Sequence, residues 1–209
     1  MADADATSRR SQRSGARLTD EHLRRLATLA EEDHAFFTRP GGRPEYESRR
    51  LAVALAQGAA LHYLDGRTGV KDLDVWTFYA AIPGRRFPAD KTVKRADFGP
   101  SSLGRQTYDM HAARSQSQRA LWQRWSAYTG RRVDFCRRAL PVQADAPINS
   151  VTSVLQEWLA RGAQSTADPK PSPWHLAKKA VVLLYPDSHR GYVVWAPGRN
   201  HHQPDVLTP

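Results

Sequence analysis

The sequence predicts an α+β fold, in which helices and short apolar strands are mixed along 209 residues. Three observations carry this prediction. The segment 18–39 has apolar residues at helical spacing, the segment 51–58 is a short apolar run, and the segment 71–82 is rich in β-branched and aromatic residues. The order is helix, strand, short helix, strand, strand and then helices, which favours a mixed α/β or α+β unit with helices packed on a small sheet.

The N-terminal part divides into a tail and a helix. Residues 1–17 are rich in Ser, Arg and Ala without apolar periodicity, so we expect a disordered basic tail. Thr19 can cap the helix over 18–39, and Asp20 and Glu21 lie in its first turn. Its apolar face carries Leu23, Leu26, Leu29 and Ala30. The stretch "PGGRP" then ends the helix.

The central part predicts two strands around a short helix. The run "LAVALAQG" (51–58) is typical of a buried strand that ends in glycine. The next segment, 59–66, is long enough for about two helical turns and also closes in glycine. Residues 71–82 form the second strand. The proline- and glycine-rich stretch 83–109 is mostly loop around one short strand.

The rest of the chain predicts further helices and strands. A helix is expected over 111–127 and a strand over 131–140, which alternates apolar and polar residues until a proline ends it. The segments 148–162 and 172–186 are predicted as helices, and 191–198 contains a last short strand.

We therefore divide the chain into three parts. After the tail, residues 18–145 are expected to form the core, and residues 146–209 a C-terminal helical segment packed on it. A hydrophobic content of 40% supplies enough apolar side chains for such a core.

Charge and cysteine content indicate the class of partner and the compartment. The net charge is +10, and residues 1–17 account for only +2 of it, through four Arg and two Asp. The remaining +8 favours polyanionic partners, either nucleotides or nucleic acid, although an ordinary soluble arginine-rich protein fits equally well.

Cys136 is the single cysteine, which excludes an internal disulfide and favours a cytoplasmic location. No apolar run approaches the roughly 18 residues of a membrane span, so we expect no membrane partner.

Two aspartates on the second strand are the strongest candidate site. Asp72 and Asp74 share one face of a strand, about 6.6 Å apart along the chain. Paired carboxylates at this spacing can hold Mg²⁺, with the phosphates of a nucleotide completing its coordination. Asp134, flanked by Val133 and Phe135, is the best third acid. The alternative is an ordinary polar strand face.

The glycine before the short helix is a candidate phosphate contact. A strand that ends at Gly58 and turns into a helix leaves backbone N–H groups and the positive end of the helix dipole directed outward. Without a Cβ, Gly58 also lets a ligand approach the backbone closely. A phosphate site would then lie beside the candidate metal site.

The stretch "QGAALHYLDGRTGVKDLDVWTF" resembles the core motif of the polymerase-β-like nucleotidyltransferase superfamily. It is most similar to the branch that contains the nucleotidyltransferase toxins of abortive-infection systems. In that pattern a strand ends in two small residues, a short helix with Ala-Leu and a Gly-Arg pair follow, and Asp-x-Asp lies on the next strand. The matching residues here are Gly58-Ala59, Ala60-Leu61, Gly66-Arg67 and Asp72-Leu73-Asp74, and "GRRVDF" resembles the strand that brings the third acid, Asp134.

The resemblance implies a small mixed sheet flanked by helices and a Mg²⁺-dependent reaction. A nucleoside monophosphate would pass from an NTP to a hydroxyl of RNA (such as tRNA), a protein or a small molecule, with release of pyrophosphate. Asp72 and Asp74 would bind Mg²⁺, and Asp134 would bind one ion and help deprotonate the acceptor. The triphosphate would contact Gly58 and Ala59. A toxin of this branch would also have a cognate antitoxin.

Two residues of the motif leave alternatives open. Ala59 stands where a Ser or Gly is usual, so a hydroxyl contact to the triphosphate is lost. Lys71 could bind phosphates or could neutralise Asp72 in a chain without metals. The rival function is accordingly a catalytically weak relative that acts as a nucleic-acid- or protein-binding module.

Other residues have structural as well as functional interpretations. Asp97 could replace Asp134 as third acid, but its Gly/Pro/Ser surroundings favour a turn. His62 is interpreted as a partly buried histidine. One of Lys178 and Lys179 could reach a triphosphate, although a solvated helix face is the simpler interpretation. Three tryptophans at helical spacing are expected in the core, with base stacking as the less favoured alternative; they are Trp122, Trp125 and Trp158.

Overall fold

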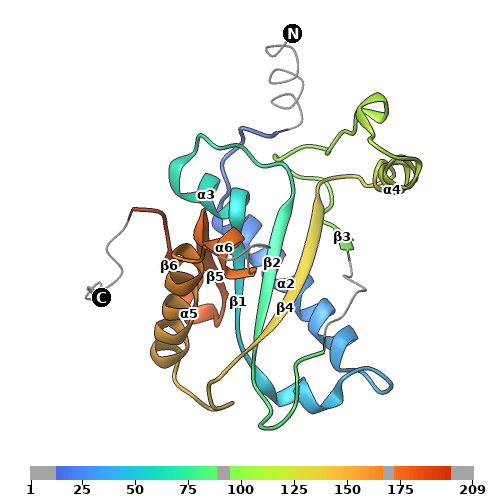
Figure 1. Cartoon of the computed structure of the whole chain (residues 1–209). Helices are drawn as coiled ribbons and strands as arrows, with labels where there is room; N and C mark the ends of the chain where they lie inside the picture. Colours follow the sequence, from blue (N-terminus) through green and yellow to red (C-terminus); the bar gives the residue numbers. More distant parts are fainter. Residues whose placement is uncertain (1–12, 89–94, 167–171, 199–209) are drawn as a thin grey trace.

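The computed structural model describes residues 13–88, 95–166 and 172–198 (Figure 1). These residues form a six-stranded sheet in the order β3-β4-β2-β1-β5-β6. The strands are β1 (Arg50–Ala56), β2 (Leu73–Ala80), β3 (Arg95–Asp97), β4 (Arg132–Leu140), β5 (Ala180–Tyr185) and β6 (Val193–Trp195). The sheet is mixed, because β2 and β4 are parallel whereas the other pairs are antiparallel.

The helices cover both faces of this sheet. They are α2 (Asp20–Thr38), α3 (Gln57–Asp65), α4 (Gln116–Trp125), α5 (Ile148–Ala163) and α6 (Ser172–Ala177), with short 3₁₀ turns η1 (Pro44–Arg49), η2 (Met110–Ala112) and η3 (Asp187–His189). In Figure 1, α2 lies behind the sheet, α5 and α6 lie in front of it, and α4 stands apart at the upper right. The predicted α+β class, a mixed sheet flanked by helices, is confirmed. No described helix is long and apolar enough to cross a membrane.

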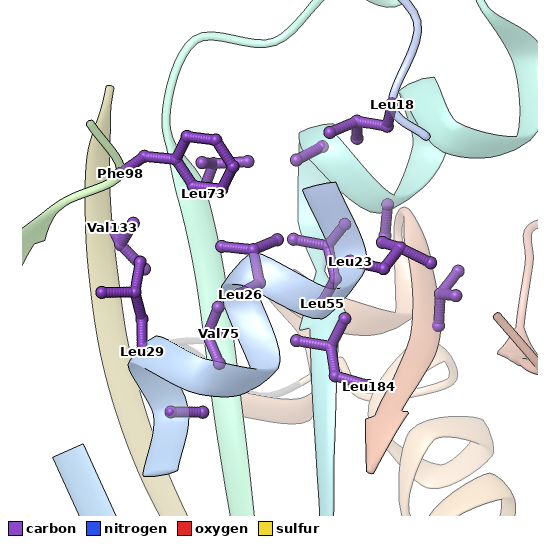
Figure 2. Close-up of a cluster of buried hydrophobic side chains, with 14 of the residues drawn as sticks. Leu18, Leu23, Leu26, Leu29, Leu55, Leu73, Val75, Phe98, Val133 and Leu184 are labelled. Carbon is purple, nitrogen blue, oxygen red and sulfur yellow. The ribbon is translucent and has the colours of Figure 1, made fainter. Parts of the chain in front are cut away.

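Helix α2 packs its apolar face on the sheet, as its sequence predicts. Its N-cap Thr19 accepts a hydrogen bond from the backbone N–H of His22. Leu23, Leu26 and Leu29 point toward strand residues such as Val75 (Figure 2). Each leucine fully removed from water contributes about 1.5–3 kcal/mol, so this face anchors the helix.

The alternation of side chains along β2 separates a core face from a polar face. Leu73 and Val75 belong to the cluster under α2, whereas Phe78 belongs to the cluster under α5. Side chains at even positions of β2 therefore face the α5 side. Asp74 faces that side, and its partner in the register across to β4 is Asp134.

One predicted helix is wrong over half its length. The segment 172–186 forms α6 and then β5, which lies between β1 and β6 in the sheet. Its apolar run "AVVLLY" is buried on both sides: Val182 and Leu184 pack under α2, and Val181 and Leu183 under α5. Periodicity cannot distinguish such a fully buried strand from a buried helix. The described part of 146–209 thus supplies strands as well as helices.

Part of the predicted tail is ordered. Residues 1–12 lie outside the described residues, but Ser14 exchanges two backbone hydrogen bonds with Val70. His62 Nε2 donates to the Ala16 carbonyl, while its Nδ1 accepts from the Gly69 N–H. His62 is buried, so its role is to join this segment to the loop before β2.

Candidate functional site

Three carboxylates meet where β2 and β4 begin. Asp74 and Asp134 lie opposite each other on these adjacent parallel strands, and Asp72 precedes Asp74 by two residues. Arg132 Nη2 lies 2.6 Å from Asp72 Oδ2 and 2.9 Å from Asp134 Oδ2. Arg95 Nε lies 3.1 Å from Asp134 Oδ1. The carboxylates Asp72 and Asp134 are therefore both held by one guanidinium.

An aromatic ring holds this guanidinium in place. The Arg132 guanidinium carbon lies 4.0 Å from the ring centroid of Trp125, the last residue of α4, and that of Arg95 lies 5.0 Å from it. Both distances are within the range of cation–π attraction. Arg132 Nε is buried without a hydrogen-bond partner, so the residue is held mainly by its Nη2 contacts and the indole.

The surroundings of Asp74 disfavour its ionised form. Burial, followed by the charges of Asp72 and Asp134, raises its pKa to about 7, although Arg132 and Lys179 oppose this shift. No ion pair to Asp74 is formed within the described part of the chain. A cation bound beside Asp74 would relieve this unfavourable charge.

The neighbouring thiol and phenol are not reactive groups. Burial, followed by the charges of Asp74 and Asp134, raises the pKa of Cys136 to about 12. Burial likewise raises the pKa of Tyr108 to about 12. Both groups are therefore neutral near pH 7, and Cys136 is no nucleophile.

Helix α3 begins beside these carboxylates with an uncapped N-terminus. Its N-cap residue Ala56 supplies no side-chain hydrogen bond. Gln57 has a φ of 58° and is, among the described residues, the one non-glycine with positive φ. This left-handed conformation costs of order 1 kcal/mol or more, and such strain clusters at functional sites.

Glycine at position 58 is not required by the protein itself. A Cβ added to Gly58 would meet Lys179 Nζ at 3.9 Å, an ordinary contact, and its φ is not in the left-handed region. Glycine nevertheless costs a helix about 1 kcal/mol relative to alanine. An unneeded glycine at a helix start leaves the backbone accessible, which suits close approach of a ligand.

The other two predicted phosphate contacts differ in position. Ala59 is buried in the core under α2, so its side chain is not available to a ligand. The Lys71 side chain is exposed, and its carbonyl accepts from Arg131 Nη1. The lysine charge that acts on Asp74 is that of Lys179, which lies between α6 and β5.

The carboxylates suit a metal ion by their chemistry, but not in this arrangement. Within the described ranges, no group of three or more His, Cys, Asp or Glu side chains is placed to hold a metal ion. Three carboxylates on one face are the hard oxygen donors that Mg²⁺ prefers. Because Arg132 contacts Asp72 and Asp134, these two can share an ion only after the guanidinium moves away.

The alternative third acid, Asp97, has a structural role. Its carboxylate accepts hydrogen bonds from the backbone of Gly99, Thr129 and Gly130 and from the Thr129 hydroxyl. Burial opposes its ionisation, but these hydrogen bonds hold its pKa below the usual value. Asp97 therefore fixes two loops, as its turn-forming surroundings indicate.

Comparisons with known protein families, curated proteins and solved structures find no match to this chain. Its function is therefore inferred from the geometry of the site.

Sequence reasoning did not identify Arg132, Arg95 or the contact with Trp125. Arg132 carried a signal, because it precedes Asp134 by two residues on β4 and so shares its face. The sequence around Arg95 held no comparable signal, because its short strand lies in a loop-like stretch and pairs with β4 only in the folded chain.

Proposed function

We propose that the protein is a Mg²⁺-dependent nucleotidyltransferase of the polymerase-β-like type, which transfers a nucleoside monophosphate from an NTP to a hydroxyl. One observation carries the proposal. Asp74 and Asp134 lie opposite each other on adjacent parallel strands, and one Arg132 nitrogen contacts both Asp134 and Asp72. Acidic side chains brought together in this way are suited to phosphoryl transfer.

The local topology supports the resemblance of the sequence. Strand β1 leads into helix α3, and β2 then pairs antiparallel with β1. Of the Asp-x-Asp motif, Asp72 directly precedes β2 and Asp74 lies on it. Strand β4 lies parallel to β2 and brings the third acid. The strand pairing thus brings together two acids of the sequence motif, Asp74 and Asp134, and Asp72 directly precedes β2.

The residues have distinct roles in the proposed reaction. Asp72, Asp74 and Asp134 would hold Mg²⁺, which would neutralise charge on the triphosphate and orient the attacking oxygen. The backbone N–H groups of Gly58 and Ala59 would bind phosphate oxygens, helped by the helix dipole and by Lys179. Asp134 would also accept the proton of the acceptor hydroxyl.

Arg132 supports a second candidate function. Its guanidinium already neutralises Asp72 and Asp134 in the way that a divalent cation would. A chain in which this pairing is permanent would keep the fold as a catalytically weak nucleic-acid- or protein-binding module. The two functions differ in whether a cation can displace Arg132.

Binding of Mn²⁺, followed by electron paramagnetic resonance with and without ATP or GTP, separates the two candidates. If the protein is an enzyme, the wild type should bind Mn²⁺–NTP. Arg132→Gln should bind free Mn²⁺ more tightly than wild type, because a competing cation is removed. Asp74→Asn should bind neither free Mn²⁺ nor Mn²⁺–NTP. A wild-type protein that binds no Mn²⁺–NTP, while Arg132→Gln does bind it, would support the module.

Replacement of the glycine tests the phosphate contact independently. Gly58→Ala should stabilise the fold by about 0.5–1 kcal/mol, because alanine favours the helix. The same change should weaken NTP binding, because the added methyl group obstructs the backbone. A variant that is more stable and binds NTP normally would exclude Gly58 from the triphosphate site.

Turnover distinguishes the two candidate third acids. Asp134→Ala should lose turnover while its NTP affinity stays near normal, whereas Asp97→Ala should lower the melting temperature and keep much of its activity. The reverse result would overturn the assignment of Asp134.

Three further features stay predictions. The acceptor is RNA, a protein or a small molecule; the cytoplasmic location follows from the single cysteine; and a cognate antitoxin follows from the resemblance alone. Radiolabelled NTPs offered with total RNA and with total protein would identify the acceptor class.

A further inference from the structure

The segment that includes helix α4 carries an unusual surface. Residues 104–128 contain four arginines and a single acidic residue, Asp109. All four arginines are exposed: Arg105, Arg114, Arg119 and Arg124. No ion pair with Asp or Glu involves any of them within the described residues. The positive charge of this segment is therefore not neutralised by the protein.

Aromatic rings lie among these arginines. Tyr108 lies with its ring centroid 5.9 Å from that of Trp122 and 5.7 Å from that of Trp125. Tyr108 and Trp122 are only partly buried, in contrast to Trp125. The core role predicted for the tryptophans thus fits Trp125 better than Trp122. A partly exposed indole beside arginines can stack on a nucleic-acid base.

This surface continues directly into the candidate site. Trp125 ends α4 and lies under the guanidinium of Arg132, which contacts Asp72 and Asp134. In Figure 1, α4 stands beyond the beginning of β4 and apart from the helices that cover the sheet. A polymer bound along α4 would therefore have an end near the carboxylates.

We propose that the exposed arginines and aromatic rings of residues 105–124 form a docking surface for single-stranded RNA. We call this surface the α4 surface. Its charge complements a phosphate backbone, its aromatic rings suit unstacked bases, and the side chains of α4 include no acid. That the bound RNA is the acceptor of the nucleotidyl group rests on the function proposed above; the docking itself does not.

The test is fluorescence anisotropy with a labelled single-stranded RNA oligonucleotide, titrated with the full chain at several salt concentrations. Nucleotide is absent, and EDTA removes divalent cations. One triple variant removes charge from the α4 surface: Arg114→Gln, Arg119→Gln and Arg124→Gln. A matched triple variant removes the same charge from exposed residues at the other end of the sheet: Arg43→Gln, Arg85→Gln and Arg86→Gln.

The α4 variant should bind RNA at least tenfold more weakly than wild type, and the matched variant should bind within about twofold. Each lost phosphate contact makes the slope of log K against log salt less negative by about 0.7. The slope of the α4 variant, which loses three arginines, should therefore be less negative than that of wild type by about 2. Trp122→Leu, which keeps an apolar side chain against Tyr108, should weaken binding about tenfold through lost stacking. Circular dichroism checks that α4 persists in each variant.

Two results would overturn the proposal. If both triple variants lose affinity equally, the whole basic surface attracts RNA and α4 is no specific site. If polyglutamate binds as tightly as RNA and Trp122→Leu binds RNA normally, the surface fits an acidic protein. Because catalysis is not measured, either result leaves the nucleotidyltransferase proposal to be judged by Mn²⁺–NTP binding.

Discussion

Replacing Asp74 with asparagine should stabilise the metal-free protein. Burial and the charges of Asp72 and Asp134 raise the pKa of Asp74 from 3.8 to about 7, despite Arg132 and Lys179. A tenfold change in an ionisation constant corresponds to about 1.4 kcal/mol, so ionised Asp74 costs the folded state about 4 kcal/mol. Asparagine keeps the shape of the side chain and carries no charge.

The pH dependence of this gain has a definite sign. A carboxyl with a raised pKa in the folded state favours folding at low pH, and that advantage is lost as pH rises from about 4 to about 7. The free energy of unfolding of Asp74→Asn should therefore exceed that of wild type by up to about 4 kcal/mol at pH 8, and by about 1.5 kcal/mol at pH 5.

Urea unfolding at pH 5 and pH 8, in EDTA, measures both differences. Asp97→Asn is the control, and it should lower the stability of the fold where Asp74→Asn raises it, because it weakens the hydrogen bonds from Thr129 and Gly130. Its stability loss should be similar at both pH values, since Asp97 has a lowered pKa and stays ionised. If Asp74→Asn gains no stability at pH 8, or gains equally at both pH values, the pKa of Asp74 is not raised in the folded protein, and neither burial nor the neighbouring carboxylates disfavour its charge as argued.

Three further substitutions test the packing around the site. Arg137→Ala should destabilise the fold by about 3–5 kcal/mol in urea unfolding, because Asp33 is fully buried and would lose the guanidinium 2.6 Å away. A loss below about 1 kcal/mol would show that other groups are enough to stabilise the buried Asp33 carboxylate. Gly162→Ala should lower the melting temperature, with a loss of about 1–3 kcal/mol, because its Cβ would lie 2.2 Å from Pro173 Cβ; an unchanged melting temperature would contradict the close packing of α5 on α6. Leu26→Ala should cost about 2–5 kcal/mol by urea unfolding, and a cost near zero would mean that α2 does not anchor the sheet.

Local sequence signals predicted most of the elements. The capping Thr19 and the leucine spacing predicted α2, and the glycine at position 66, which adopts a φ of 63°, predicted the end of α3. The strand-like run around Asp134 became β4, parallel to β2. These features depend on residues close together in the chain.

Features that depend on distant residues were not predictable in the same way. The run 180–185 is apolar at every position but the last, so its pattern does not distinguish a helix from a strand. Pairing with β1 decides the outcome. Likewise, the contact of Arg132 with Trp125 requires α4 to lie over the start of β4, which no local signal encodes.

The position of β5 between β1 and β6 has a consequence for synthesis. Strand β1 pairs on one side with β2, which follows it closely, and on the other with β5, more than a hundred residues later. Until residue 185 leaves the ribosome, the apolar β1 keeps an unpaired edge, and such edges promote association between chains. Nascent chains that stall before this point are therefore expected to aggregate, so the elongation rate through residues 140–185 influences the soluble yield of the protein.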